Sequence, residues 1–499
     1  MPLAQDLLSL EYRKSWKQIY DEGDHTSIYH AAQALMTMQH AFGLFPRILG
    51  KGDLAQRLAS LLLRQKREHI TLDPKNPALT HASTTIDSLV IIDRSVDLAT
   101  PMCSQLTYEG LLDELIGIEA AHVEVPDLNA LPISPPASND LQAPSGSNTP
   151  LLPQTPRGGK RKKHHLDPIT DRVVAVIRDD NFAVVGMKLH EVAKRLNQDY
   201  DTRHTARTVP QMRAFVGRLG GLEQDRANLS IHTGLAQAIM RETGSERFAR
   251  VLEIEQNLVA GVGLAEQQNA IEELINMEAP LATVVRLMCL LSVVGGGLKP
   301  KTLEFFKREI LQTYGFEHLP LLLKLAKVGL LAKATPASTR ANIGFAGVRR
   351  SLKLINDDVD EHRPRDISYV YSGYAPLSVR LVQAIAQKEA FIDPKRRLGA
   401  TPESALSAPR AHPIIGWRGF EEVIACLPGA TVDESQAQPT ASASDPDQIT
   451  TTVVFFLGGI TYAEIAAIRY MSRQTRNRRF LIATTQTITG TTLVQDLYP

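Results

Sequence analysis

Cysteine is scarce in this sequence, and its spacing fits neither disulfides nor metal binding. Three cysteines occur among 499 residues, at Cys103, Cys289 and Cys426. They lie far apart and form no CxxC motif, which excludes a zinc knuckle and a disulfide framework. We expect a chain that resides in a reducing, cytosolic compartment.

A charge excess is also missing. The chain has 55 Lys and Arg residues against 54 Asp and Glu residues, which leaves a net charge of +1. Proteins that bind nucleic acids normally carry a clear basic excess. The balance of charge therefore argues against a nucleic-acid partner.

Long hydrophobic runs and a secretory signal are absent as well. The most apolar stretch, Leu281–Val294, contains Arg286 and ends at three glycines. It is shorter than the roughly 20 apolar residues that a membrane-spanning helix needs. The first residues, MPLAQDLLSLEYRKSW, contain no basic region followed by an apolar run. We expect membrane contact only through partners.

What the sequence does contain is typical of a globular protein. Hydrophobic residues make up 43% and charged residues 22%, and the length suggests about three domains. Three stretches lack apolar periodicity and are predicted to be surface inserts, namely 126–168, 393–412 and 433–448. The first carries the basic cluster Lys160–His165. We interpret this cluster as a solvated loop rather than a nuclear-import signal or an acidic-lipid contact.

Three apolar runs predict buried strands: Ser88–Ile92 near the start, and Thr452–Leu457 and Phe480–Ala483 near the end. Most of the sequence between Ile169 and Gln387 has helical periodicity instead. The predicted fold class is therefore α/β. A parallel sheet flanked by helices carries a large inserted, mainly α-helical domain, and the far C-terminus completes the sheet.

Counted spacings support the helical assignments. Apolar residues recur every three or four positions from Phe182 to Leu196, and again from Met212 to Leu219 after Pro210. The polar segment Asp201–Thr208 lies between them, so the two helices are predicted to form a hairpin. A later block, Leu303–Leu331, has the same periodicity with breaks at Gly315 and Pro320.

Two glycine-containing segments invite comparison with phosphate-binding loops. FLGGITYAEI, at 456–465, has strand, turn and helix character, but it lacks the GxGxxG spacing and the Walker lysine. We favour a capping box between Thr461 and Glu464. For Gly50–Asp53 no preceding strand is expected, so a turn before a helix is the better interpretation.

Candidate catalytic groups are few. Asp93 and Asp97 follow a predicted strand, where α/β enzymes place reactive groups. Arg94 lies between them, and the next carboxylates are Glu109 and Asp113, so a structural Asp–Arg network is favoured.

The fourteen histidines form no HExxH motif and no Cys/His set. His25 and His30 are five residues apart, and His164 and His165 lie in the first insert. A GxSxG elbow is missing too. The sequence therefore predicts no catalytic residue, no cofactor and no metal.

Several long segments resemble one family. SLVIIDRSVDLATPMCSQLTYEGLLDEL, from Ser88, is similar to the characteristic strand and loop of SM proteins, the chaperones of SNARE-driven membrane fusion. Five further segments resemble the vacuolar sorting branch of that family: DLLSLE at Asp6, GKGDLA at Gly50, FKREILQTYGFEHL at Phe306, YVYSGYAPLSVRLVQ at Tyr369 and FFLGGITYAEIAAIRY at Phe455.

The resemblance implies a domain plan. Residues 1–125 and 413–499 would form the family's second, α/β domain. Residues 169–247 would form a helical hairpin subdomain, and 248–392 a second helical subdomain, together making the third domain. Family members begin with a further α/β domain, and by this resemblance the present sequence would start where the family's second domain starts. That further domain forms one wall of the cleft for the syntaxin-like Qa-SNARE, so Qa-SNARE binding is the family activity carried over least.

The resemblance also implies a function. In this branch the SM subunit of the HOPS and CORVET tethering complexes binds SNARE motifs and templates their assembly for fusion of endosomes with the vacuole or lysosome. The hairpin would contact an R-SNARE, and the expected contact residues are Gln211, Arg213, Ala214, Gly217 and Arg218. The class C solenoid subunit would dock on the later helical block, at Lys307, Phe316 and Leu319. For Phe316 and Leu319 the helical pattern equally fits core positions.

The implied location is cytoplasmic, with peripheral attachment to vacuole, lysosome and late endosome membranes through the complex. The alternative hypothesis is a nucleotide-using α/β enzyme with a helical insertion, which would bind its ligand near Gly458.

Overall fold

The computed structural model describes residues 6–12, 14–74, 79–125, 162–205, 209–334, 344–391, 414–436 and 449–498. It divides into two compact units. The first unit consists of residues 1–114, 178–184 and 244–499, and the second of 115–177 and 185–243.

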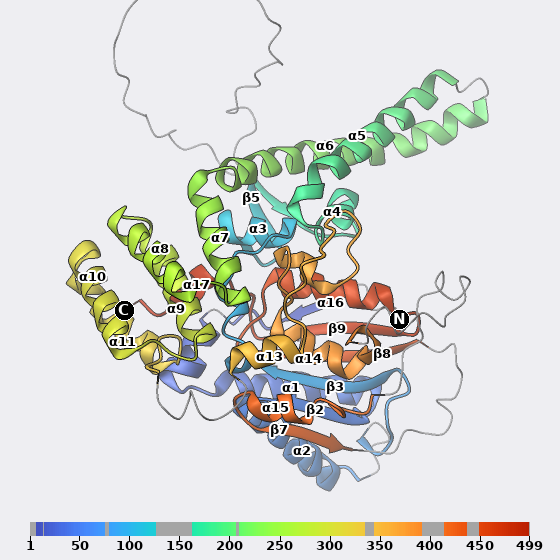
Figure 1. Cartoon of the computed structure of the whole chain (residues 1–499). Coiled ribbons are helices and arrows are strands. Elements are labelled where there is room, and N and C mark those ends of the chain that lie inside the picture. Colours follow the sequence, from blue (N-terminus) through green and yellow to red (C-terminus); the bar gives the residue numbers. More distant parts are fainter. Residues whose placement is uncertain are drawn as a thin grey trace, which may run out of the picture. The chain divides into compact units, whose positions relative to one another are not determined.

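The first unit is built on a six-stranded sheet in the order β1-β9-β8-β3-β2-β7 (Figure 1). Its strands are β1 (Leu7–Ser9), β2 (Arg47–Lys51), β3 (Ile86–Asp93), β7 (Thr431–Ser435), β8 (Thr450–Leu457) and β9 (Arg478–Thr484). All neighbouring strands are parallel except β7, which runs antiparallel to β2. The three strands predicted from apolar runs are therefore confirmed as β3, β8 and β9, and the C-terminal segment does complete the sheet.

Both faces of this sheet are covered, which explains why its central strands are continuous apolar runs. On one face, α1 (Thr26–Phe42) and α2 (Asp53–Leu72) pack against Leu89, Phe455 and Leu481. Alternation along the strands points Val90 and Phe456 to the opposite face, where α16 (Tyr462–Gln474) packs against β9.

The helices of 244–334 include one strongly apolar helix. They are α7 (Glu246–Ala260), α8 (Leu264–Asn276), α9 (Leu281–Val294), α10 (Pro300–Tyr314), the 3₁₀ turn η6 (Phe316–His318) and α11 (Leu319–Lys327). The most apolar stretch of the sequence is α9, which packs against α7, α8 and α17 (Gly490–Asp496). Its charged residue, Arg286, is buried and pairs with Glu114 and Glu255 at 2.5 and 2.9 Å. No helix among the described residues is both long and apolar enough to cross a bilayer.

Shorter elements complete the first unit. They are the π-helical η1 (Lys17–Glu22), the 3₁₀ turns η3 (Arg94–Val96), η4 (Thr100–Met102), η7 (Ile367–Tyr371) and η8 (Lys388–Phe391), and the helices α3 (Tyr108–Leu115), α13 (Phe345–Ser351), α14 (Leu377–Ala386) and α15 (Glu421–Cys426).

The second unit contains a small antiparallel sheet and long helices. The sheet has the order β4-β5-β6, with β4 at Ile118–Glu119, β5 at His122–Val125 and β6 at Lys162–His165. It is accompanied by α4 (Arg172–Ile177), α5 (Phe182–Thr205) and α6 (Val209–Thr243). Figure 1 shows α5 and α6 as two long consecutive helices. The predicted helix after Pro210 is confirmed, and it extends far beyond Leu219.

Four expectations from the sequence are wrong in detail. A strand, β2, does precede Gly52, and the predicted insert 433–448 begins inside β7. β7 is an edge strand with four exposed residues, so it lacks the apolar run that marks a central strand. The insert 126–168 ends in β6, which places His164 and His165 in a sheet.

The connection between the two hairpin helices also differs from the prediction. The polar segment Asp201–Thr208 was expected to be a loop, yet α5 continues to Thr205. Polar residues are compatible with a helix whose surface faces solvent, so polarity alone did not mark its end. Residues 206–208 and the insert 393–412 lie outside the described residues.

Candidate functional site

The Asp93–Arg94–Asp97 segment forms a closed ion-pair network rather than a reactive site. Arg94 is fully buried, and its Nη1 lies 2.9 Å from both carboxylate oxygens of Glu464. Its Nη2 lies 3.3 Å from Asp97 Oδ2. Burial works against the charge of Arg94, but Glu464 and Asp97 outweigh it and raise the pKa of the guanidinium above its usual value. The structural interpretation of this segment is therefore confirmed.

Asp93 is equally occupied. Its carboxylate accepts hydrogen bonds from the Tyr20 hydroxyl at 2.5 Å and from the backbone N–H groups of Ser95 and Leu54 at 2.9 and 3.0 Å. These contacts join β3 to η1 and to the start of α2. Asp93 therefore has a structural role, although it lies at the sheet edge where α/β enzymes hold catalytic groups.

The Gly458–Gly459 turn has no room for a phosphate. A β-carbon added at Gly458 would lie 2.8 Å from the Tyr20 hydroxyl, and one at Gly459 would lie 2.5 Å from Ile488. The first backbone N–H groups of α16 are also used, since Ala463 donates to Gln105 at 2.9 Å and Glu464 to Thr461 at 3.2 Å. Thr461 and Glu464 form the predicted capping box.

The Gly50–Asp53 turn is closed in the same way. Lys51 Nζ donates to the Gly429 carbonyl at 2.7 Å and to Thr431 Oγ1 at 3.2 Å. A β-carbon on Gly52 would lie 2.2 Å from Asp93. The lysine thus holds the loop before β7 and is not free to contact a phosphate.

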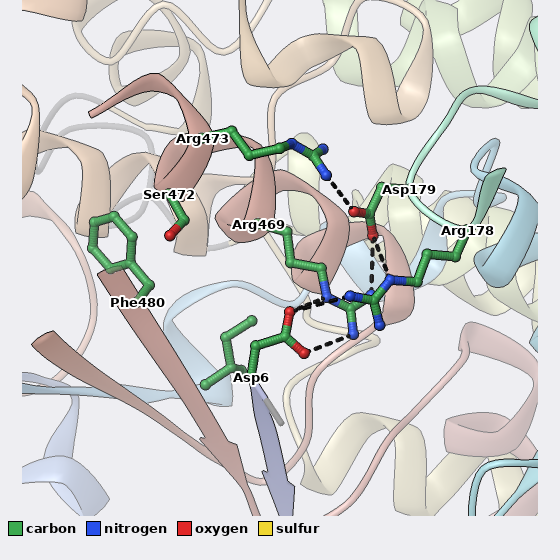
Figure 2. Close-up of a pocket in the computed structure, with 8 residues that line it drawn as sticks. Asp6, Arg178, Asp179, Arg469, Ser472, Arg473 and Phe480 are labelled. Carbon is green, nitrogen blue, oxygen red and sulfur yellow. Dashed lines mark hydrogen bonds and ion pairs between the residues drawn. The ribbon is translucent and has the colours of Figure 1, made fainter. Parts of the chain in front are cut away.

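Figure 2 shows a polar pocket that the sequence did not indicate. It is lined by Asp6, Arg178, Asp179, Arg469, Ser472, Arg473, Phe480 and Ile482. Arg469 contacts Asp6 at 2.8 Å and Asp179 at 3.0 Å, and Arg473 contacts Asp179 at 2.7 Å. Each arginine already faces a carboxylate, so the pocket offers little net charge to an anion. Its pairs instead connect β1, α16 and the segment that enters α5.

An apolar surface lies at the turn between α10 and α11. Phe316, Leu319 and Leu323 are 74%, 41% and 57% exposed. We call these three residues the η6–α11 surface. On the other face of α11, Leu321, Leu322 and Leu325 are fully buried. The helix is therefore apolar on both faces, and solvent covers only one of them.

The η6–α11 surface is firmly anchored. Gly315 has a φ of 113°, which allows the chain to turn sharply between α10 and η6. Lys324 Nζ donates to the Leu497 carbonyl at 3.1 Å, and Lys327 forms an ion pair with Asp21 at 2.9 Å. The exposed apolar side chains thus project from a fixed backbone, as a docking surface requires.

Comparison with known proteins identifies the family. The Sec1 family profile matches residues 1–496. The chain belongs to the Sec1 family. Vacuolar protein sorting-associated protein 33A of Rattus norvegicus is 39% identical to this Sec1-family chain over 500 residues, which cover 100% of the chain and 75% of the relative. The vacuolar protein-sorting-associated protein 33 homolog of Arabidopsis thaliana is 32% identical, with 99% and 75% covered.

Solved structures share the fold. The SM protein Vps45 in complex with the Qa-SNARE Tlg2 superposes with a TM-score of 0.61 at 16% identity, covering 99% of this chain and 74% of that one. The Unc18–syntaxin 1 complex from Monosiga brevicollis gives 0.62 at 15% identity, covering 99% and 75%. The α/β sheet with its helical additions is thus the SM fold.

The predicted contact residues of this Sec1-family chain lie in three places: the η6–α11 surface, α10 and α6. Phe316 and Leu319 are adjacent on the η6–α11 surface and are exposed, which removes the core alternative. Lys307 lies on α10, where it is only 20% exposed and pairs with Glu304 at 3.3 Å. Leu323, which the sequence analysis did not name, is also exposed and follows Leu319 by one helical turn. The hairpin residues, all on α6, lie outside the described side chains: Gln211, Arg213, Ala214, Gly217 and Arg218.

Proposed function

We propose that this Sec1-family chain is the SM subunit of a HOPS- or CORVET-type tethering complex. In that role it binds SNARE motifs and templates their assembly for fusion at endosomes and the vacuole or lysosome. The observation that carries the proposal is the 39% identity to vacuolar protein sorting-associated protein 33A along the whole chain. Structures with the same fold are described as complexes with the Qa-SNARE Tlg2 and with syntaxin 1.

Templating is a physical task that needs no bond chemistry. Unpaired SNARE motifs are disordered, and ordering each backbone residue costs about 1–2 kcal/mol. A surface that holds two motifs in register makes their first contacts effectively intramolecular. Binding of a helix in a groove then supplies the early order.

The helix α6 has the length for such a template. Its 35 residues span about 50 Å, or roughly five heptads. Gly220 and Gly221 lie inside it, where each glycine costs about 1 kcal/mol relative to alanine. A β-carbon at either position would meet no atom within 4 Å. A partner helix that approaches closely at this point would give these glycines a role, which supports R-SNARE binding next to Gln211–Arg218.

The η6–α11 surface is proposed as the docking site for the class C solenoid subunit. Burying an exposed Phe or Leu side chain contributes about 1.5–3 kcal/mol, and Phe316, Leu319 and Leu323 offer three such groups on a fixed turn. Lys307 would need to release Glu304 to take part. Through this partner the chain would be held at vacuole, lysosome and late endosome membranes.

The nucleotide-enzyme alternative receives no support. It rests on the turn at Gly458, where Tyr20, Arg94 and Ile488 fill the space a phosphate would need. We therefore propose a non-enzymatic role.

We also propose the following domain plan. Residues 1–125 and 413–499 form the α/β domain, and the helical subdomains are 169–247 and 248–392. The inserts are 126–168, 393–412 and 433–448, except that β6 and the start of β7 within them belong to sheets.

Two titrations test the function directly. An immobilised R-SNARE motif should bind the chain, whereas the same motif with its central heptad residues changed to aspartate should not. Isothermal titration with ATP, GTP and NAD should give no binding heat. Absence of SNARE binding together with sub-millimolar nucleotide binding would replace the template proposal by the enzyme alternative.

A further inference from the structure

Three side chains of types that can ligate a metal converge inside the second unit, although no sequence motif predicts their proximity. His164 Nε2 lies 2.9 Å and His232 Nε2 lies 2.8 Å from the same atom, Asp171 Oδ2. All three ligand atoms lie within 4.8 Å of one another. The residues come from β6, from the turn before α4 and from α6, and their positions match no local motif.

The cluster is buried and aimed inward. His232 is fully buried, the Asp171 side chain is 2% exposed and the His164 side chain is 14% exposed. The two imidazole rings meet edge to face at 5.4 Å. Both histidines therefore present Nε2 to the same carboxylate oxygen, and His164 is the most exposed of the three side chains.

The carboxylate of Asp171 is already oriented by the backbone. Its Oδ1 accepts hydrogen bonds from the N–H groups of Val173 and Val174 at 2.9 and 3.1 Å. This leaves Oδ2 as the atom that faces the histidines. Outer contacts that fix a carboxylate in this way are a regular feature of metal sites.

We propose that His164 Nε2, Asp171 Oδ2 and His232 Nε2 form a site for one divalent transition-metal ion, with Zn²⁺ as the best match. Two imidazoles favour zinc over magnesium or calcium, which prefer oxygen ligands. Three protein ligands leave a fourth position, and a water molecule can reach it from the His164 side.

The distances between the three ligand atoms determine how far the side chains must move to bind the ion. In a tetrahedral zinc site with bonds of about 2.0 Å, neighbouring donors are roughly 3.3 Å apart. The separations of 2.8 and 2.9 Å are hydrogen-bond lengths, so the side chains must move apart by about 0.5 Å to admit the ion. Once bound, the ion would tie α6 to β6 and to the start of α4. It would thereby fix the base of the long helix independently of what that helix binds.

The experiment compares metal binding by matched histidine variants. Wild-type chain stripped with EDTA is titrated with Zn²⁺ by calorimetry, and thermal unfolding is followed with and without the ion. We expect one site with a dissociation constant on the order of 1 μM or tighter, and a higher unfolding midpoint with Zn²⁺ but not with Mg²⁺. His232→Gln and Asp171→Asn should each weaken binding by about 100-fold or more.

The control is a second histidine pair in the same unit. The rings of His122 and His165 are tilted by 33° with centroids 4.6 Å apart, and His165 points to the opposite face of β6 from His164. The double variant His122→Gln/His165→Gln should bind zinc as the wild type does. If His232→Gln fails to fold, the more exposed His164→Gln serves in its place, with circular dichroism as the check.

Cobalt(II) gives an independent readout, because a four-coordinate site produces strong visible d–d bands. Three results would overturn the proposal: no zinc binding by the wild type, binding that survives His164→Gln and His232→Gln, or binding lost only in the His122→Gln/His165→Gln variant. In each of these cases the cluster is a hydrogen-bond network alone.

Discussion

Arg94 Nη1 contacts both carboxylate oxygens of Glu464 in an ion pair whose side chains are fully buried, although 370 residues separate them in the sequence. Arg94 follows β3 and Glu464 lies in the first turn of α16. The pair therefore fastens the N-terminal part of the sheet to its C-terminal part. Glu464 also accepts a hydrogen bond from Ser378, which draws α14 into the same network.

Replacing one residue of the buried Arg94–Glu464 pair should greatly reduce the free energy of unfolding. Arg94→Met or Glu464→Gln leaves an uncompensated buried group, and we expect a loss of about 3–5 kcal/mol of unfolding free energy. The double variant should lose clearly less than the sum of the two. Denaturant unfolding of the two single variants and the double variant measures these losses.

The control is the exposed pair of Arg64 with Glu68. Arg64→Met, which breaks it, should cost less than about 1 kcal/mol of unfolding free energy. Additive losses at Arg94 and Glu464 would contradict a direct coupling.

The turn at Gly458 should be sensitive to a single methyl group. Gly458 has a φ of 91°, and its β-carbon would collide with Tyr20. Gly329 has a similar φ of 83° but would meet no atom within 4 Å. Gly329→Ala therefore measures the backbone cost alone, about 1 kcal/mol, and Gly458→Ala should destabilise by more than that in thermal unfolding. Equal losses would mean that Tyr20 does not fill the turn.

Stability should fall between mildly acidic and neutral pH because of one buried carboxyl group. Burial raises the pKa of Glu255 from 4.5 to about 7, although Arg286 and Ser104 act in the opposite direction. The folded chain then holds a proton that the unfolded chain has released. Folding takes up this proton between about pH 4.5 and 7, so the stability contributed by Glu255 is lost as pH rises through that window.

Glu255→Gln tests this sign. The free energy of unfolding at pH 5 minus that at pH 7 should be larger for the wild type than for the variant, by on the order of 1–3 kcal/mol. An unchanged pH dependence would show that Glu255 stays ionised in the folded chain.

The η6–α11 surface should be required for the tethering partner and dispensable for the fold. Phe316→Asp or Leu323→Asp should weaken binding to the class C solenoid subunit by about 30-fold or more, as expected for an interface hot spot. Leu72→Asp is the matched control, since Leu72 is 83% exposed at the end of α2. Pull-down and calorimetry with folded variants decide the point. Equal binding by Phe316→Asp and Leu72→Asp would remove this surface from the interface.

The sequence predicted those parts of the fold that have a strong local pattern. Central strands such as β3 and β8 are apolar runs because both faces are buried, and Gly315 did mark a break. The edge strand β7 and the small sheet have only two to five residues per strand, too few for a clear alternation. Pairing partners could not be predicted either. The capping role of Glu464 follows from Thr461 three residues before it, but its contact with Arg94 depends on the tertiary fold.

The same limit applies to the candidate sites. Exposure of Phe316 could not be decided from its spacing, because α11 is apolar on both faces. His164, Asp171 and His232 are separated by 7 and 61 residues, and only the packing of α6 brings them together.

The central claim is tested most directly by the rate at which R-SNARE and Q-SNARE motifs assemble in solution, followed by fluorescence transfer between labelled motifs. Wild-type chain should accelerate assembly, and Arg213→Glu/Arg218→Glu on α6 should abolish most of the acceleration. Arg241→Glu, at the exposed last turn of the same helix, should leave it intact. Two results would contradict the account: the wild-type chain leaves the assembly rate unchanged, or the Arg213→Glu/Arg218→Glu and Arg241→Glu variants lose the acceleration to the same extent.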